Sequence, residues 1–167
     1  MTAGRKRPAP PGPVLGWREW ARLPDFGVRS IKAKLDTGAR TSALHAFGLR
    51  RFTRDGRPMV RFAIHPLQRS ADSTVAAEAV VVDERVVRNS GGREEVRPVI
   101  RTTIQIGTER WPIEVTLTRR DQMGFRMLLG REALRGRVVV DAGSSFRAGR
   151  PGRSARSGGR SSGGEEE

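Results

Sequence analysis

Asp36, Thr37 and Gly38 form the group with the clearest chemical potential in this sequence. They lie in KAKLDTGARTSALHA, residues 32 to 46, where a short extended stretch gives way to a turn. Gly38 allows backbone N–H groups to approach the carboxylate closely, and a positioned carboxylate can act as a general base. The same three residue types are common in ordinary turns, so the triplet alone indicates chemistry only weakly.

A second segment, MLLGREAL (127 to 134), strengthens this interpretation. It is typical of a buried apolar strand that ends at Gly130. Good helix formers follow and Gly136 closes them, which predicts a short helix over 131 to 136. A strand with Asp-Thr-Gly-Ala followed later by apolar-apolar-Gly-Arg and a helix is a more specific pattern than either half.

Together with GWREW (16 to 20), RPVIRT (97 to 102) and TRRDQMGFRMLLGREAL (118 to 134), these motifs resemble the bacterial retropepsin-like aspartic proteases labelled putative ATP-dependent zinc proteases. The resemblance covers residues 14 to 146. It implies an aspartic endopeptidase in which the two segments cross beneath the active site. Members often accompany ATP-grasp ligases that add glutamates, so it also implies a glutamate-rich or oligoglutamate substrate and a functional link to such a ligase.

Peptide hydrolysis by this mechanism requires two carboxylates that share one proton. The chain contains one Asp-Thr-Gly, so a homodimer with a two-fold axis through the site is expected to supply the second carboxylate. Asp36 is then the catalytic residue. By the resemblance, Thr37 would brace the pair across the interface, and Gly38 and Ala39 would line the floor under the peptide.

Basic residues surround this predicted site. Lys32, Lys34 and Arg40 would flank a groove for an acidic chain. By the resemblance, the loop that carries the acid would be supported from below by Leu129, Gly130 and Arg131.

Arg40 departs from the viral retropepsin pattern, in which an Asp at this position pairs with the Arg of the Gly-Arg segment. Arg131 therefore loses its expected partner. Two interpretations follow: Glu132 or another acid compensates in an internal ion pair, or Arg40 turns to the groove and binds substrate carboxylates bidentately.

Other chemistries find little support. The only histidines, His45 and His65, are twenty residues apart, no HExxH is present, and catalytic zinc normally needs three protein ligands. No GxSxG occurs, and Ser42 and His45 would point to opposite faces of a strand. No GxxxxGK[ST] loop occurs, so ATP would have to be bound by a partner. We therefore expect no metal and no cofactor.

The composition leaves one rival hypothesis. A net charge of +14 attracts polyanions, which include nucleic acid and acidic peptides. A non-catalytic basic β-barrel that binds RNA or an acidic protein partner would explain the charge, although no basic strand carries stacking aromatics. The chain has no cysteine and no apolar run that could form a signal or a membrane span, so a cytoplasmic protein is expected.

The sequence pattern predicts that the elements positioning the site are mainly β-strands. Apolar residues alternate in VRFAIH (60 to 65) and WPIEVTLT (111 to 118), and β-branched residues dominate 77 to 87 and 96 to 106. This predicts an all-β, retropepsin-like, closed or partly closed barrel with one short helix near its C-terminal end. The domain would span 14 to 146 between disordered tails at 1 to 13 and 147 to 167.

A hairpin is expected to close over the groove as a flap. The two candidates are the Asp55-Gly56 turn within 51 to 62 and the turn within 86 to 96.

Overall fold

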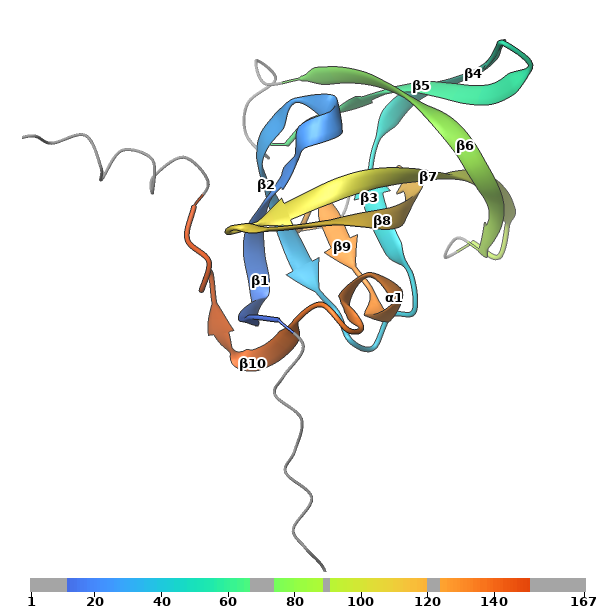
Figure 1. Ribbon diagram of the computed structural model, residues 1–167. Helices are drawn as coiled ribbons and strands as arrows, with labels where there is room; N and C mark the ends of the chain where they lie inside the picture. The colour runs from blue at the N-terminus through green and yellow to red at the C-terminus, as the bar shows by residue number, and fades with distance from the viewer. Residues whose placement is uncertain (1–11, 67–73, 89–90, 120–123, 151–167) are drawn as a thin grey trace, which may run out of the picture.

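The architecture is almost entirely β-structure, which confirms the predicted all-β class. A computed structural model describes residues 12–66, 74–88, 91–119 and 124–150 (Figure 1). The predicted tails lie largely outside these residues. The elements are β1 (Val14–Leu23), η1 (Pro24–Phe26), β2 (Val28–Leu35), β3 (Ser42–His45), β4 (Phe47–Arg54), β5 (Arg57–Ile64), β6 (Val75–Arg88), β7 (Glu94–Ile106), β8 (Glu109–Thr118), β9 (Met127–Leu129), α1 (Arg131–Leu134) and β10 (Val139–Ser145).

The strands predicted from alternation are confirmed. The stretches 60–65, 77–87, 96–106 and 111–118 correspond to β5, β6, β7 and β8. In β8 the alternating residues Trp111, Ile113, Val115 and Leu117 are all buried, as expected when one face of a strand packs on a core. The predicted helix at 131–136 is shorter than expected, because α1 ends at Leu134.

The sheet closes on itself into a ring. Its strand order is β10-β1-β2-β9-β3-β8-β7-β6-β5-β4, and an additional pairing joins β1 to β7 through Arg22 and Gln105. The ring therefore runs through β1, β2, β9, β3, β8 and β7, and β6, β5 and β4 extend from it as hairpins (Figure 1). The predicted closed or partly closed sheet is therefore present as this ring of strands.

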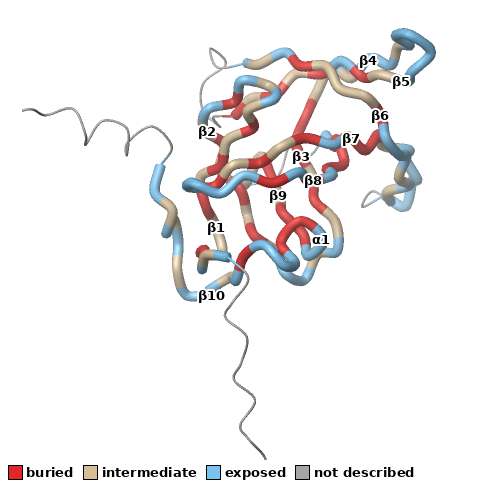
Figure 2. The backbone as a smooth tube through the Cα atoms, viewed as in Figure 1, coloured by how far each residue is buried: buried red, intermediate tan, exposed pale blue. Residues whose placement is uncertain are grey.

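The core fills the interior of this ring. Buried segments follow β1, β3, β7, β9 and α1, whereas the β4–β5 tip and much of β10 are exposed (Figure 2). Among the largest fully buried side chains are Leu23, Ile31, Leu44, Ile104 and Leu129. The core thus joins strands that are distant in sequence, and it holds the end of β2 and the whole of β9 in fixed positions. No helix in the described parts of the chain is long and apolar enough to cross a membrane.

Both predicted hairpins are present. The turn between β4 and β5 has positive φ at Asp55 (51°) and Gly56 (74°), as two-residue hairpin turns of this class require. The pairing of β6 with β7 extends to Arg88 and Glu94. Residues 89 and 90 of the second turn lie outside the described residues.

A buried carboxylate connects the two ends of the described chain. Glu19 on β1 has no exposed surface, and it accepts hydrogen bonds from the N–H groups of Gly16 (2.6 Å), Arg147 (2.9 Å) and Ala148 (3.0 Å). β10 also pairs in parallel with β1. Sequence analysis did not identify β1, β10 or this carboxylate clamp.

Candidate functional site

Asp36 stands immediately after β2, in a turn fixed by backbone hydrogen bonds. Its N–H donates to the carbonyl of Leu129 at 2.8 Å, and its carbonyl accepts from the N–H of Ala39 at 3.2 Å. Strand β2 continues into this turn in register with β9, with Leu35 opposite Leu129. The main chain on both sides of the carboxylate is therefore held to the core.

The Asp36 carboxylate is oriented by its own loop. Oδ1 accepts hydrogen bonds from the N–H of Gly38 at 2.9 Å and from the N–H of Ala39 at 3.2 Å. A side chain at residue 38 would begin 3.1 Å from this oxygen, so glycine leaves room for the carboxylate. Within the described part of the chain, Oδ2 has no hydrogen-bond partner, and the residue is half-buried at the surface. One oxygen is thus fixed and the other is available.

The two segments singled out in the sequence meet at β9. This strand lies between β2, to which it is parallel, and β3, to which it is antiparallel (Figure 1). At its end the N–H of Gly130 donates to Ser42 Oγ at 3.0 Å. A Cβ at residue 130 would lie 2.5 Å from the carbonyl oxygen of Thr41, so only glycine fits at this crossing.

The start of α1 binds the loop from the other side. The N–H of Arg131 donates to the carbonyl of Ala39 at 2.7 Å, and the N–H of Glu132 donates to the carbonyl of Arg40 at 3.1 Å. With the bonds of Asp36 and Gly130, these contacts tie the Asp-Thr-Gly-Ala-Arg loop to the Leu-Gly-Arg-Glu segment. The structure therefore brings Asp36, Gly38 and Ala39 together with Leu129, Gly130 and Arg131.

The ion pair at this junction differs from both sequence-based interpretations in one respect. Arg40 Nε lies 3.0 Å from Glu132 Oε1, so Glu132 pairs with Arg40 and not with Arg131. Within the described residues Arg131 has no ion pair. The Arg40–Glu132 pair is exposed, with 78% and 50% of the side-chain surfaces accessible, and exposed pairs contribute little to stability. The predicted compensating acid is therefore present, but it lies on Arg40, and the predicted substrate-binding role of Arg40 stays a prediction.

The other predicted residues, Thr37, Lys34 and Lys32, lie around the turn and make no side-chain hydrogen bond to the described residues that would define a role. Thr37 is exposed, and Lys34 is half-buried on the strand that leads to Asp36. Lys32, two residues earlier, places its ammonium 5.3 Å from the centre of the Phe125 ring. The roles predicted for Thr37 and Lys34 stay predictions.

The site does not suit zinc, the metal in the family label discussed above. No group of three His, Cys, Asp or Glu residues in the described ranges is arranged to hold a metal ion. His65 Nδ1 lies 2.7 Å from Thr74 Oγ1, and its ring stacks on Phe47 with centroids 4.1 Å apart. His45 is buried on β3.

Sequence reasoning missed the role of Ser42. It considered this residue only as a possible nucleophile, whereas the hydroxyl accepts the Gly130 amide inside the crossing. A polar residue that begins the apolar stretch SALH was the available signal. Trp111 was recognised only as part of an alternating strand, and its indole Nε1 donates to the Ala133 carbonyl at 2.8 Å, which anchors α1 to β8.

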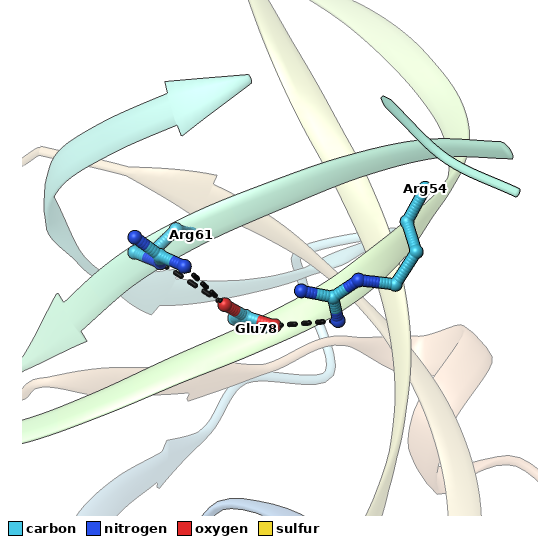
Figure 3. A network of polar contacts seen from close by, with 3 residues as sticks. All are labelled: Arg54, Arg61 and Glu78. Carbon is cyan, nitrogen blue, oxygen red and sulfur yellow. Dashed lines mark hydrogen bonds and ion pairs between the residues drawn. The ribbon is translucent and has the colours of Figure 1, made fainter. Parts of the chain in front are cut away.

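Much of the positive charge on the β4–β5–β6 sheet is neutralised locally. Glu78 accepts hydrogen bonds from Arg54 (2.8 Å) and from Arg61 (2.6 and 3.0 Å), as Figure 3 shows. Hydrogen bonds from Arg61 and then Arg54 lower the pKa of the Glu78 carboxyl. Arg51 likewise forms a two-point pair with Glu84. This sheet therefore presents fewer unpaired cations than its sequence suggests.

Comparison with known proteins decides the family. A family model described as retropepsin-like aspartic endopeptidase RimB matches residues 14–151. The chain belongs to the RimB-like family of retropepsin-like aspartic endopeptidases. The resemblance read from the sequence motifs is thereby confirmed.

Similar sequences occur within longer proteins. The chain is 47% identical over 139 residues to a protein of Shewanella pealeana and 48% identical over 136 residues to one of Parasynechococcus marenigrum, both named probable alpha-L-glutamate ligase. These matches cover 83% and 81% of this chain, but the chain spans only about 30% of the length of those relatives.

A solved structure shares the fold. A Legionella pneumophila protein described as of unknown function superposes with a TM-score of 0.68 at 29% identity. The match covers 81% of this chain and 97% of the other.

Proposed function

We propose that this RimB-like chain is an aspartic peptidase whose active site is completed by a second copy of the chain. The single observation that carries the proposal is the Asp36 carboxylate, with Oδ1 fixed by two amides, Oδ2 unpartnered within the described residues, and its loop locked to the Leu129–Glu132 segment. The chain has one Asp-Thr-Gly, so the second carboxylate must come from a symmetry-related copy.

The chemistry follows from two Asp36 carboxylates placed face to face. Like charges at such a separation cannot both ionise cheaply, so the pair holds one proton. The ionised carboxylate takes a proton from water while the protonated one donates a hydrogen bond to the peptide carbonyl, and the water oxygen bonds to the carbonyl carbon. Transfer of a proton to the amide nitrogen then accompanies cleavage of the C–N bond, which releases an acid and an amine.

The loop supplies the positioning that this reaction needs. Fixed main-chain donors hold each carboxylate without reorganisation during the reaction, which is how preorganised sites lower a barrier. Thr37 is exposed beside Asp36 and is available to brace the partner loop. Gly38 and Ala39 would form the floor beneath the peptide.

We further propose a glutamate-rich or oligoglutamate substrate. Lys34 and Arg40 flank the turn, and the chain carries a net charge of +14, which favours an acidic peptide. The relatives named glutamate ligases support a functional link to a ligase that adds glutamates, because a hydrolase would reverse such an addition. We do not extend the ligase activity in those names to this chain, because the match covers only 30% of the length of the Shewanella pealeana protein.

The direct test incubates wild-type and Asp36→Asn protein with oligoglutamate and with unbiased peptide pools, and reads the products by mass spectrometry. Asp36→Asn is isosteric and should abolish cleavage while the protein stays folded and dimeric. Cleavage that survives this substitution would contradict the assignment of Asp36. Salt-sensitive RNA binding unaffected by Asp36→Asn, without hydrolysis of any peptide, would favour the non-catalytic alternative.

A further inference from the structure

A cavity beside the Asp-Thr-Gly loop has features of a recognition pocket. Its volume is about 270 Å³. Its walls come from the segment that follows the loop (Thr41), from β6 (Arg85), from β7, from β8 and from the start of α1. Since Thr41 is five residues beyond Asp36, and Glu132 binds the loop through Arg40, the cavity adjoins the candidate site.

The charges that line the cavity leave one guanidinium without a partner. Arg101 pairs with Glu114 at 3.1 Å, and Glu132 pairs with Arg40. Both acidic residues of the lining are therefore neutralised. Arg85 is half-buried and has no ion pair or hydrogen bond to its side chain within the described residues. The cavity thus presents a net uncompensated positive charge.

A buried hydroxyl in the same lining also lacks a partner. Thr116 is 5% exposed, and its Oγ1 makes no hydrogen bond to any residue that the structure describes. Buried polar groups in folded proteins are almost always hydrogen-bonded, so such an atom calls for an explanation. A ligand oxygen would satisfy it, because a hydroxyl can donate as well as accept.

Part of the remaining lining is apolar. Val99, Ile113 and Ala133 line the cavity and are buried in the fold. An apolar wall with a cation and a hydroxyl matches a side chain with a methylene stem and a terminal anion. We propose that this cavity is a subsite for a carboxylate-bearing side chain of the peptide, with Arg85 as its ion-pair partner and Thr116 as an additional donor.

This subsite rests on the proposed function for its place along the substrate. The binding test is therefore made separately from hydrolysis. The background is the Asp36→Asn protein, so that titrated peptide is not consumed.

In the experiment, triglutamate is titrated into Asp36→Asn protein and into the same protein carrying a second substitution, with heat of binding as the readout. Arg85→Ala should weaken binding about tenfold or more, because it removes a charged hydrogen-bonding partner. Thr116→Val should weaken it about threefold to tenfold. It should not lower the unfolding midpoint, because the hydroxyl loses no partner within the protein.

Arg88→Ala is the matched control. Arg88 lies on the same strand as Arg85, pairs with Glu94 at 3.3 Å and does not line the cavity, so its loss should leave affinity nearly unchanged. Triglutamine, which carries side-chain amides in place of the carboxylates of triglutamate, should bind weakly to every variant. Equal affinity of the Arg85→Ala and Arg88→Ala proteins, or no binding of triglutamate at millimolar concentration, would overturn the subsite. Wild-type protein that fails to hydrolyse peptides, although Arg85→Ala still selectively loses binding, would instead overturn the peptidase proposal.

Discussion

Gly130→Ala tests the crossing that holds the Asp36 loop. The added Cβ would lie 2.5 Å from the carbonyl oxygen of Thr41 and 2.6 Å from its carbonyl carbon. Contacts under 3.0 Å are essentially never made by real Cβ atoms. Both opposing atoms belong to the backbone, so no side-chain rotation relieves the clash. The strand end and the loop must move apart.

The cost can be estimated from two contributions. Inserting a methyl group into a packed region typically costs about 1–3 kcal/mol. Separating the segments also weakens the bonds from the Gly130 N–H to Ser42 and from the Arg131 N–H to Ala39, each worth about 1 kcal/mol. We expect the free energy of unfolding to fall by about 2–4 kcal/mol, with peptidase activity reduced in whatever protein stays folded.

The assay is urea unfolding followed by tryptophan fluorescence at one fixed protein concentration, since dimerisation couples stability to concentration. Gly124→Ala is the matched control, because a Cβ at residue 124 would meet no heavy atom of the described residues within 4 Å. Its effect should stay within about 0.5 kcal/mol. If Gly130→Ala unfolds at the same urea concentration as Gly124→Ala, the close crossing described here is wrong.

Three further predictions concern other parts of the molecule. Glu19→Ala should destabilise the fold by about 3 kcal/mol or more, because one buried and two part-buried N–H groups lose their charged acceptor. Urea unfolding measures this, and an unchanged midpoint would refute the clamp. Hydrogen bonds from Arg61 and Arg54 lower the pKa of Glu78, so the ionised carboxylate stabilises the fold above the ordinary glutamate pKa, and this stabilisation is lost as the pH falls through the lowered pKa. The difference in unfolding midpoint between wild type and Glu78→Gln should therefore narrow from pH 7 to pH 3. A constant difference would argue against the ion pairs. Arg40→Ala should raise KM for glutamate-rich peptides while leaving the unfolding midpoint nearly unchanged, and a large loss of stability with unaltered KM would assign Arg40 a purely structural role.

The sequence was sufficient for most strands and for the central pairing of segments. Alternating residues such as Val60, Phe62 and Ile64 report directly on a face packed against a core, and the structure buries all three. The crossing of the Asp-Thr-Gly and Leu-Gly-Arg segments was expected from the family resemblance that these motifs carry together, and not from either turn alone. The structure places Gly130 against Thr41 with no space for a side chain.

The sequence was insufficient where long-range contacts override local pattern. β10 has the sequence VVDAGSS, whose small and polar residues favour strands little, and it is held by parallel pairing with β1 and by the Glu19 clamp. A register shift between Gly16 and Arg18 also interrupts the alternation of β1. The Arg40–Glu132 pair joins residues 92 positions apart. Nothing local in the sequence indicates the pairing of β10 with β1 or the Arg40–Glu132 ion pair.

A subunit-mixing experiment tests the central claim most directly. Wild-type and Asp36→Asn chains are unfolded together, refolded at equal amounts and assayed for oligoglutamate hydrolysis at a fixed total protein concentration. If two Asp36 carboxylates from different chains form each site, only wild-type pairs are active, and random pairing leaves about a quarter of the all-wild-type rate. A rate of about one half, the value expected when each chain acts alone, would contradict the shared active site.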